Sequence, residues 1–428
     1  MQNNTIPILL LTGYLGSGKT TLINRILSNQ KGLKFAVIVN DIGEVNIDAT
    51  LIQKEGIVSQ SDDSLVALQN GCICCSLKTD LVKQVQDIAA THKFDYIAIE
   101  ASGICEPEPI AQTLVGMQKL SNRYYGFDIC RLDCVVSVVD ALRLQSEFSC
   151  GEDLALQLSS SENIENLIVQ QIEFCNIVLL NKVDEVDASE LGRIKQIIRT
   201  LQPDAKIIET NYADVDMAEI LNTNLFDFNK TTLSAKWIQE IERPLTEDEE
   251  YEARHVGHHH HYHHHHEEHE HHHHHHEEHE YDHEHHHHHG EGCQCGHCAG
   301  KHHSHGDEYG ISTFVYYRRP AFDYKKFDAL VSSKWDKSIL RTKGVCYFSQ
   351  NPEMSYLFEQ AGVQKNLREA GLWLCTAPEE EIENMKLNDP SIERDWDDVY
   401  GDKMQKIVFI GQHMDVEEIK KMLDSCIA

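Results

Sequence analysis

The chain has 428 residues, of which 41% are hydrophobic, enough to build the cores of two or three domains. It carries 38 basic and 69 acidic residues, a formal charge of −31, which argues against nucleic acid or an anionic membrane surface as the main partner. No apolar run approaches the roughly 18 residues needed to cross a bilayer, so we expect a cytoplasmic protein.

Short, nearly continuous apolar runs alternate with amphipathic stretches up to about residue 230. We expect buried strands at Ile6–Leu11, Phe35–Val39, Tyr96–Glu100, Cys134–Asp140 and Ile177–Leu180. Helical spacing of apolar residues occurs in Lys19–Ser28, Ser76–Thr91, Glu162–Phe174 and Ser189–Leu201. Apolar strands separated by helices indicate an α/β fold, a doubly wound and mostly parallel sheet covered on both faces. We assign this domain to residues 1–230.

A phosphate-loop (P-loop) motif follows the first expected strand and opens the first expected helix. Gly13-Tyr-Leu-Gly16-Ser17-Gly18-Lys19-Thr20 matches Gly-x-x-x-x-Gly-Lys-Thr, and Thr21 follows it. In such loops backbone N–H groups wrap the phosphates, Lys19 reaches the β and γ groups, and the Thr20 hydroxyl binds Mg²⁺. An ordinary glycine turn would not require this complete motif in this context.

Asn181-Lys182-Val183-Asp184 stands at the end of the last expected strand of this domain. A carboxylate at Asp184 can accept from the N1–H and the 2-amino group of guanine together, a donor pair that adenine lacks. Because ligands of parallel α/β sheets bind at the carboxyl ends of the strands, we expect GTP rather than ATP.

Two carboxylates are further candidates for hydrolysis, beside Lys19. Glu100 ends an apolar strand and would hold the Mg²⁺ shell or position water; a solvated strand-end glutamate is the alternative. Asp41 follows the second strand, where a switch loop would lie, and is a candidate for orienting the attacking water.

Three thiols, Cys72, Cys74 and Cys75, fall within four residues just before an expected helix. Thiolates are preferred ligands of Zn²⁺ and Cu(I), and a tetrahedral Zn²⁺ site would need one ligand from outside this motif. Buried structural thiols or an iron–sulfur ligand set are the alternatives. The isolated cysteines elsewhere are expected in the core, with Cys105 the one to test as an extra ligand.

Residues 231–309 are expected to be an acidic, His-rich linker, disordered from about residue 245. Of 29 histidines, 27 fall between His255 and His305, and the tract His258–His289 alternates imidazole clusters with glutamates. Neutral imidazole binds Zn²⁺, Ni²⁺, Cu²⁺ and Co²⁺, so we expect several weak sites. A solubilising linker and an appended tag are the alternatives. A tighter secondary zinc site is expected from Cys293, Cys295, His297 and Cys298.

The apolar pattern returns from Gly310, and residues 310–428 are expected to form a small α+β domain. Expected strands are Ile311–Tyr317, Val345–Phe348, Leu372–Cys375 and Ile407–Ile410, and expected helices are Phe322–Val331 and Val416–Cys426.

These motifs together resemble the CobW-type family of GTPases, the metal-insertion and zinc-homeostasis group related to the nickel chaperones of urease and hydrogenase. The resemblance rests on Gly13–Thr21, Asn40–Asp48, Gly71–Cys75, Glu100–Gly103 with Glu106-Pro107, and Asn181–Asp184. In the C-terminal part it rests on Leu340–Gly344 and Ile407–Gly411.

The resemblance implies GTP hydrolysis coupled to delivery of a transition metal, most simply zinc, to a client metalloenzyme. Cys72, Cys74 and Cys75 would be the ligands, and Glu44 matches a switch-loop glutamate that could complete the metal shell. At Asp41-Ile42 the chain departs from the Glu-Phe of many members, and the shorter carboxylate reaches less far. A zinc store with a regulatory GTPase domain, a nickel or cobalt insertase, and a GTP-dependent homodimer all stay open.

Overall fold

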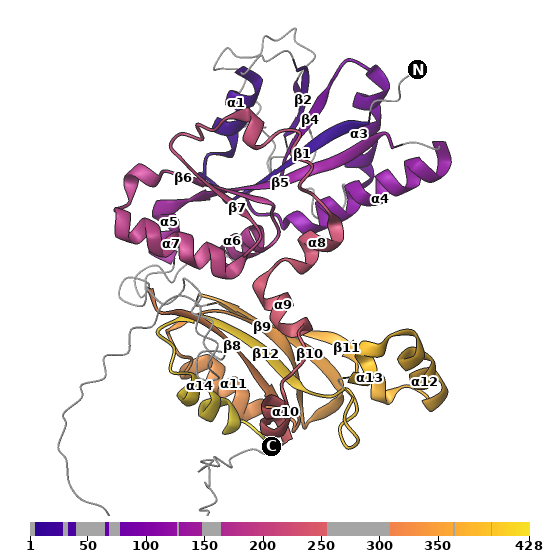
Figure 1. Cartoon of the computed structure of the whole chain (residues 1–428), viewed down its shortest axis with the longest axis vertical. Helices are drawn as coiled ribbons and strands as arrows, with labels where there is room; N and C mark the ends of the chain where they lie inside the picture. Colours follow the sequence, from indigo (N-terminus) through magenta and orange to yellow (C-terminus); the bar gives the residue numbers. More distant parts are fainter. Residues whose placement is uncertain are drawn as a thin grey trace, which may run out of the picture.

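The computed structural model describes residues 5–28, 33–39, 65–67, 78–125, 128–147, 164–254, 309–362, 364–394 and 396–428. Two bodies follow one another along the long axis of the molecule (Figure 1). The first is built around a parallel sheet, the second around an antiparallel sheet, and helix α9 (Lys236–Glu242) lies between them. Within these residues no helix is long and apolar enough to cross a membrane.

The first sheet has seven strands in the order β3-β2-β4-β1-β5-β6-β7, and every neighbouring pair is parallel. Their bounds are β1 (Ile6–Thr12), β2 (Phe35–Val39), β3 (Leu65–Ala67), β4 (Tyr96–Glu100), β5 (Cys130–Asp140), β6 (Ile177–Asn181) and β7 (Lys206–Thr210). The five strands expected from the apolar runs are all present. β7 was not expected because its apolar run, Ile207 and Ile208, is only two residues long, and only its last residue is buried.

Helices cover both faces of this sheet, as the alternation of β1 side chains makes clear. Leu9 and Leu11 pack with Leu22 and Ile26 of α1 (Lys19–Ser28) on one face. Ile8 and Leu10 belong to the core of the opposite face. That face is covered by α3 (Lys78–Thr91), α4 (Pro107–Tyr125), α5 (Ala141–Glu147), α6 (Ile164–Glu173) and α7 (Ala188–Leu201). The expected doubly wound α/β fold is confirmed.

The second sheet is antiparallel, in the order β11-β10-β9-β12-β8. Its strands are β8 (Ile311–Arg318), β9 (Ile339–Phe348), β10 (Asn351–Ala361), β11 (Gln364–Leu372) and β12 (Gln405–Gln412). Its helices are α11 (Tyr324–Ser333), α12 (Glu379–Asn388), α13 (Pro390–Arg394) and α14 (Val416–Asp424). Phe327 of α11 and Ile419 of α14 join Phe409 of β12 in one aromatic-rich core. The expected α+β domain is confirmed, although Leu374–Thr376 is a 3₁₀ turn rather than a strand.

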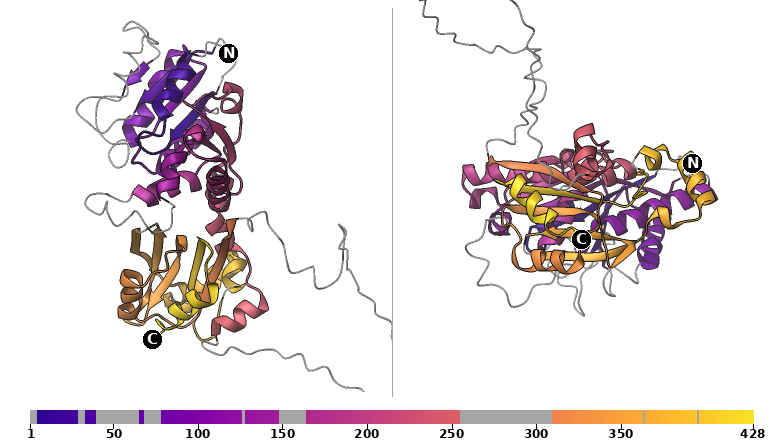
Figure 2. Two further views of the ribbon diagram at one scale, coloured as in Figure 1. Left: turned by 90° about the vertical axis from the view of Figure 1, so that its left-hand side faces the viewer. Right: turned by 90° about the horizontal axis from the view of Figure 1, so that it is seen from below.

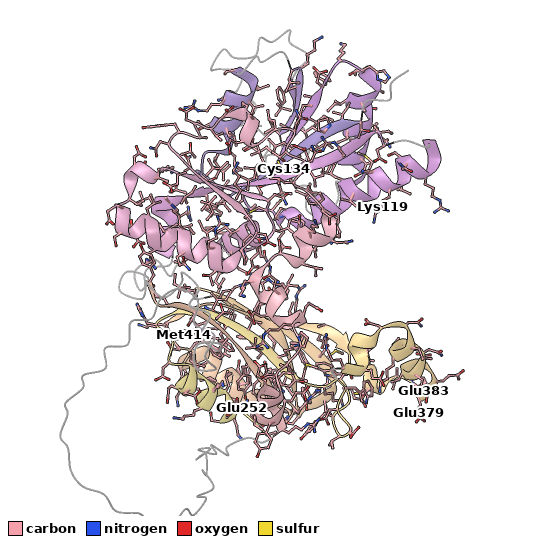
Figure 3. All side chains as sticks on the ribbon, in the orientation of Figure 1. Lys119, Cys134, Glu252, Glu379, Glu383 and Met414 are labelled. Carbon is pink, nitrogen blue, oxygen red and sulfur yellow. The ribbon has the colours of Figure 1, made fainter. Side chains whose placement is uncertain are left out.

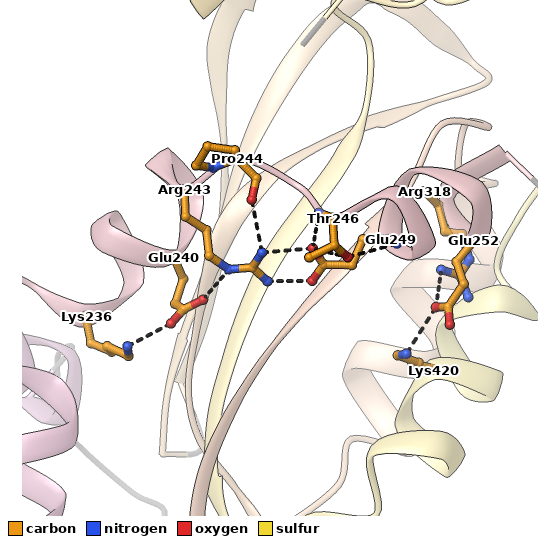
Figure 4. Close-up of polar contacts among 9 residues, drawn as sticks. All are labelled: Lys236, Glu240, Arg243, Pro244, Thr246, Glu249, Glu252, Arg318 and Lys420. Carbon is orange, nitrogen blue, oxygen red and sulfur yellow. Dashed lines mark hydrogen bonds and ion pairs between the residues drawn. The ribbon is translucent and has the colours of Figure 1, made fainter. Parts of the chain in front are cut away.

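The stretch between the two sheets departs from the expected linker, because it contains α8 (Phe228–Leu233), α9 and α10 (Glu247–Arg254). The prediction of disorder from about residue 245 was therefore wrong for α10. Arg243 clamps Glu249 through two hydrogen bonds of 2.8 and 2.5 Å (Figure 4). The Thr246 hydroxyl and the Glu249 carboxylate also bond each other's backbone N–H, a capping box. Ala253 of α10 is buried where this helix packs against the second domain. The charged residues that favoured a prediction of disorder instead form the ion pair and the N-terminal cap of α10.

Candidate nucleotide site

The phosphate loop connects the buried end of β1 to the first turn of α1. Gly13, Gly16 and Gly18 have φ values of 136°, 78° and 112°, a backbone conformation that side chains with a Cβ rarely adopt. Within the loop, the Ser17 N–H donates to the Tyr14 carbonyl over 3.2 Å. The expected strand–loop–helix context of the motif is confirmed.

Two of these glycines are also required by their neighbours. A Cβ on Gly13 would lie 2.2 Å from the Val138 carbonyl oxygen, and one on Gly18 would lie 2.4 Å from the amide nitrogen of Asn181. Both distances are shorter than any real carbon contact, so neighbouring strands close around the loop at glycine positions.

Lys19 and the hydroxyl groups near it provide the polar part of the loop. Lys19 is 7% exposed, and its ammonium donates to the Tyr14 carbonyl over 3.2 Å. The hydroxyls of Thr12 and Ser17 are buried and make no hydrogen bond to any described residue. Buried hydroxyls beside a lysine and a set of glycines fit a phosphate chain, which would hydrogen-bond to them.

Glu100 is placed at the same edge of the sheet by strand register. It pairs with Leu11 of β1 on one side and Val39 of β2 on the other, and it is 1% exposed. Thr20 lies in the first turn of α1. A hydroxyl and a carboxylate are oxygen ligands of the kind that Mg²⁺ prefers, so the residues present fit this ion.

Asn181 joins the base-recognition motif to the phosphate loop. It is 2% exposed; its amide donates to the Ser17 carbonyl over 2.8 Å, and its side-chain oxygen accepts from the Ala213 N–H over 3.0 Å. Asp184 is exposed, and its backbone N–H donates to the Asn211 side chain over 3.1 Å. Asn181 therefore joins the phosphate loop to the loop after β7, whereas the Asp184 carboxylate is exposed.

Sequence reasoning missed two parts of this site: Asp140, and the loop that follows β7. Lys182 has a left-handed backbone (φ 60°), and its ammonium forms an ion pair with Asp140, the last residue of β5. Asp140 also accepts from the Arg143 N–H over 3.1 Å at the start of α5. Tyr212 and Ala213 continue the site after β7 with φ values of 52° and 53°. A carboxylate at the end of a buried strand was the available signal for Asp140.

The expected metal ligands Cys72, Cys74, Cys75 and Glu44 lie outside the described residues, as does Asp41. The His258–His289 tract and the ligand set Cys293, Cys295, His297 and Cys298 also lie outside them. Among the residues that are described, no three His, Cys, Asp or Glu side chains gather as a metal site.

The isolated cysteines that the structure describes are core residues, as expected. Cys105, Cys130, Cys134, Cys175, Cys346 and Cys426 are buried, and Cys375 is partly buried. Cys134 lies inside the first sheet (Figure 3). Burial raises the pKa of Cys130 and of Cys134 to about 12, which keeps both thiols protonated at neutral pH and poor metal ligands.

A glycine loop at a helix N-terminus, a buried lysine, a strand-end glutamate and an Asn-Lys-x-Asp motif now stand at one edge of a parallel sheet. This combination defines a P-loop GTPase. The family model for the nucleotide-binding domain of CobW/HypB/UreG matches residues 7–209, and that for the cobalamin synthesis protein cobW C-terminal domain matches residues 311–427. The chain belongs to this family.

Two relatives show how far the similarity extends. The chain is 31% identical over 442 residues to "Zinc-regulated GTPase metalloprotein activator 1" of Dictyostelium discoideum, covering 99% of this chain and 80% of that protein. It is 31% identical over 238 residues to "Zinc chaperone YjiA" of Escherichia coli, covering 54% of this chain and 66% of that protein.

Proposed function

We propose that this protein is a GTP-hydrolysing metallochaperone that carries zinc to client metalloproteins. The observation that carries the proposal is the similarity along 99% of the chain to a relative named as a zinc-regulated GTPase metalloprotein activator. The nucleotide edge described above supports the GTPase half. The other half, that the metal is zinc, which residues bind it and that a client protein receives it, is the proposal.

The strand topology supports a connection between the two halves. β2 ends at Val39 and β3 at Ala67, and both strands run parallel to β1. Their carboxyl ends therefore lie at the edge of the sheet that carries the phosphate loop. In the sequence, Glu44 follows β2 by five residues and Cys72 follows β3 by five residues. We propose that Cys72, Cys74, Cys75 and Glu44 hold zinc more tightly in one nucleotide state than in the other.

Hydrolysis in this proposal rests on positioning and charge. Thr20 and Glu100 would hold Mg²⁺, which would supply positive charge to offset that of the phosphates. Lys19 exchanges its neutral partner, the Tyr14 carbonyl, for phosphate oxygens. Asp184 accepts from the guanine base, and Asp41 orients the attacking water.

The test is a chelator-competition Zn²⁺ titration with a non-hydrolysable GTP analogue and with GDP. It is made on the full chain and on a variant lacking residues 255–305. We expect the Zn²⁺ affinity of the tight site to differ about tenfold between the two nucleotides, which is a coupling free energy of about 1.4 kcal/mol. The difference should appear in the full chain and in the deletion variant. Cys74→Ser should abolish the tight site, whereas Cys375→Ser, a partly buried thiol of the second domain, should not. Equal affinity with both nucleotides contradicts the proposal.

The His258–His289 tract favours a second candidate, a zinc store regulated by the GTPase domain. In the metallochaperone proposal this tract, with Cys293, Cys295, His297 and Cys298, is a reservoir between domains 1–230 and 310–428. A store would lose most of its bound zinc on deletion of 255–305. A chaperone would keep its tight site and its GTP hydrolysis.

A further inference from the structure

A cavity lies between the two domains, behind the phosphate loop. Its volume is about 1110 Å³. Tyr14 and Leu15 of the phosphate loop line it together with Ile104, and Lys343 of β9 and Glu359 of β10 line the opposite side. The back of the nucleotide site therefore faces the second sheet, and Asn166 and Glu173 of α6 also line this space. Two views turned by 90° show the first domain lying against the second (Figure 2).

Arg341 of β9 joins the second sheet to α6 through a buried ion pair. Its Nε donates to Glu173 Oε1 over 2.9 Å, and its Nη2 donates to Oε2 over 3.0 Å. Its Nη1 donates to the Asn166 side chain over 2.8 Å. Arg341 is 1% exposed and Glu173 is 6% exposed. Because Asn166 and Glu173 are seven residues apart, one guanidinium holds α6 at two points along one face.

Gln171 joins the same helix to the nucleotide site. It is 1% exposed, and its amide nitrogen donates to the carbonyls of Gly103 and Cys105 over 3.3 and 3.2 Å. These carbonyls belong to the segment that directly follows Glu100. On its other side this segment touches the phosphate loop, since a Cβ on Gly103 would lie 2.9 Å from the Leu15 nitrogen. Residues 102–105 are thus held between the phosphate loop and α6.

In P-loop GTPases the γ-phosphate and Mg²⁺ order switch segments beside the nucleotide, and hydrolysis depends on their position. We propose that Arg341 is a positioning residue for GTP hydrolysis. Through Glu173 and Gln171 it holds residues 102–105, so that the second domain sets the rate at the nucleotide site. The proposal rests on the GTP hydrolysis proposed above.

Such a link transmits position because each contact is directional. A two-pronged ion pair fixes the helix in distance and in angle, and a buried amide with two acceptors cannot shift without losing a bond. The Leu340–Gly344 motif of the sequence thereby gains a role. Its arginine reaches out of the second domain, whereas Lys343 pairs with Glu359 within it.

The test is steady-state GTP hydrolysis by the full chain carrying Gln171→Met, Arg341→Lys, or both. Gln171→Met keeps about the same side-chain volume but removes the amide that donates to the Gly103 and Cys105 carbonyls. Arg341→Lys keeps the positive charge but removes the two-pronged guanidinium contact to Glu173. The matched control is Arg318→Lys, because Arg318 makes the same two-pronged contact to Asp424 inside the second domain. The thermal unfolding midpoint is measured for every variant.

Each single variant is expected to lower kcat about fivefold or more while KM stays within about twofold. The kcat of the double variant should fall no further than that of the more impaired single variant, because both substitutions break the same connection. Arg318→Lys should keep the wild-type kcat. If Arg341→Lys does not fold, Glu173→Gln takes its place.

An unchanged kcat, multiplied losses in the double variant, or an equal loss in Arg318→Lys would each overturn the role of Arg341. A wild-type chain that does not hydrolyse GTP would overturn the proposed function itself, and this inference with it.

Discussion

The nucleotide edge and the junction between the two domains are both built from buried polar contacts, but of different kinds. At the nucleotide edge side chains bond backbone groups of the phosphate loop, as where the Asn181 amide donates to the Ser17 carbonyl. At the junction they involve charged side chains from distant segments, as where Arg341 meets Glu173. Backbone chemistry of the first kind needs particular residue types in a particular order. Charged pairs of the second kind need only two common residues that meet.

The largest expected effect comes from replacing the first glycine of the phosphate loop. In Gly13→Ala the new methyl group would collide with the Val138 carbonyl at 2.2 Å, at a φ of 136°. We expect loss of GTP binding in equilibrium titration and a loss of about 2–6 kcal/mol in the free energy of unfolding, from strain and overpacking. Gly116→Ala on α4, where nothing lies within 4 Å, should change stability by no more than about 1 kcal/mol. Wild-type GTP affinity in Gly13→Ala would contradict the role of this contact.

At the junction, Arg341→Ala should destabilise the protein by about 3–5 kcal/mol, because it leaves the Glu173 carboxylate buried beside a cavity. Urea unfolding of the full chain measures this difference. The comparison variant is Arg25→Ala, whose ion pair with Asp214 is exposed and should contribute about 1 kcal/mol or less. Equal losses in the two variants would show that burial does not distinguish the two pairs.

Base recognition gives the next effect. Asp184→Asn removes a charged acceptor at an exposed position, so we expect GTP affinity to fall about 10- to 100-fold without loss of stability. Competition between GTP and ATP for a fluorescent guanine nucleotide measures it. Glu185→Gln, one residue further along the same turn and also exposed, is the control and should bind GTP as the wild type does. Unchanged affinity in Asp184→Asn would remove Asp184 from the site.

The smallest effect concerns the helix before the His-rich tract. Hydrogen bonds from Arg243 lower the pKa of Glu249 to about 2, from an unfolded value near 4.3. A lowered pKa means that the stabilisation is present above about pH 4.3 and is lost as the pH falls through about 2. Since the pair is partly exposed, Arg243→Gln should cost about 0.2–1 kcal/mol at pH 6, and less at pH 3.

Unfolding midpoints of the wild type and Arg243→Gln at the two pH values check this expectation. Glu250→Gln, which replaces an exposed neighbour on α10, is the control and should leave the unfolding midpoint at pH 6 unchanged. A difference that grows toward pH 3 would have the wrong sign for this ion pair.

Local signals in the sequence were sufficient for much of the fold and for the core of the candidate site. The apolar runs of β1, β2, β4, β5 and β6 predicted a parallel sheet because strands buried on both faces leave an unmistakable pattern. α10 was missed because its residues are mostly charged, and β7 because its apolar run is only two residues long. α10 is held by the ion pairs of Arg243 and Arg318, and β7 by its pairing with β6. Arg318 and β6 lie far from these elements in the sequence, so a local window does not show them.

The sequence by itself determined the phosphate loop, the base motif and the family, because catalytic backbone geometry requires glycine, lysine and asparagine at fixed spacing. Only the tertiary structure decided that Asp140 holds Lys182, that Gln171 holds residues 102–105, and that Arg341 reaches α6. These partners are separated by 42 to 168 residues. Aspartate, glutamine and arginine occur at many surface positions, and only the folded chain shows which of them are buried against one another.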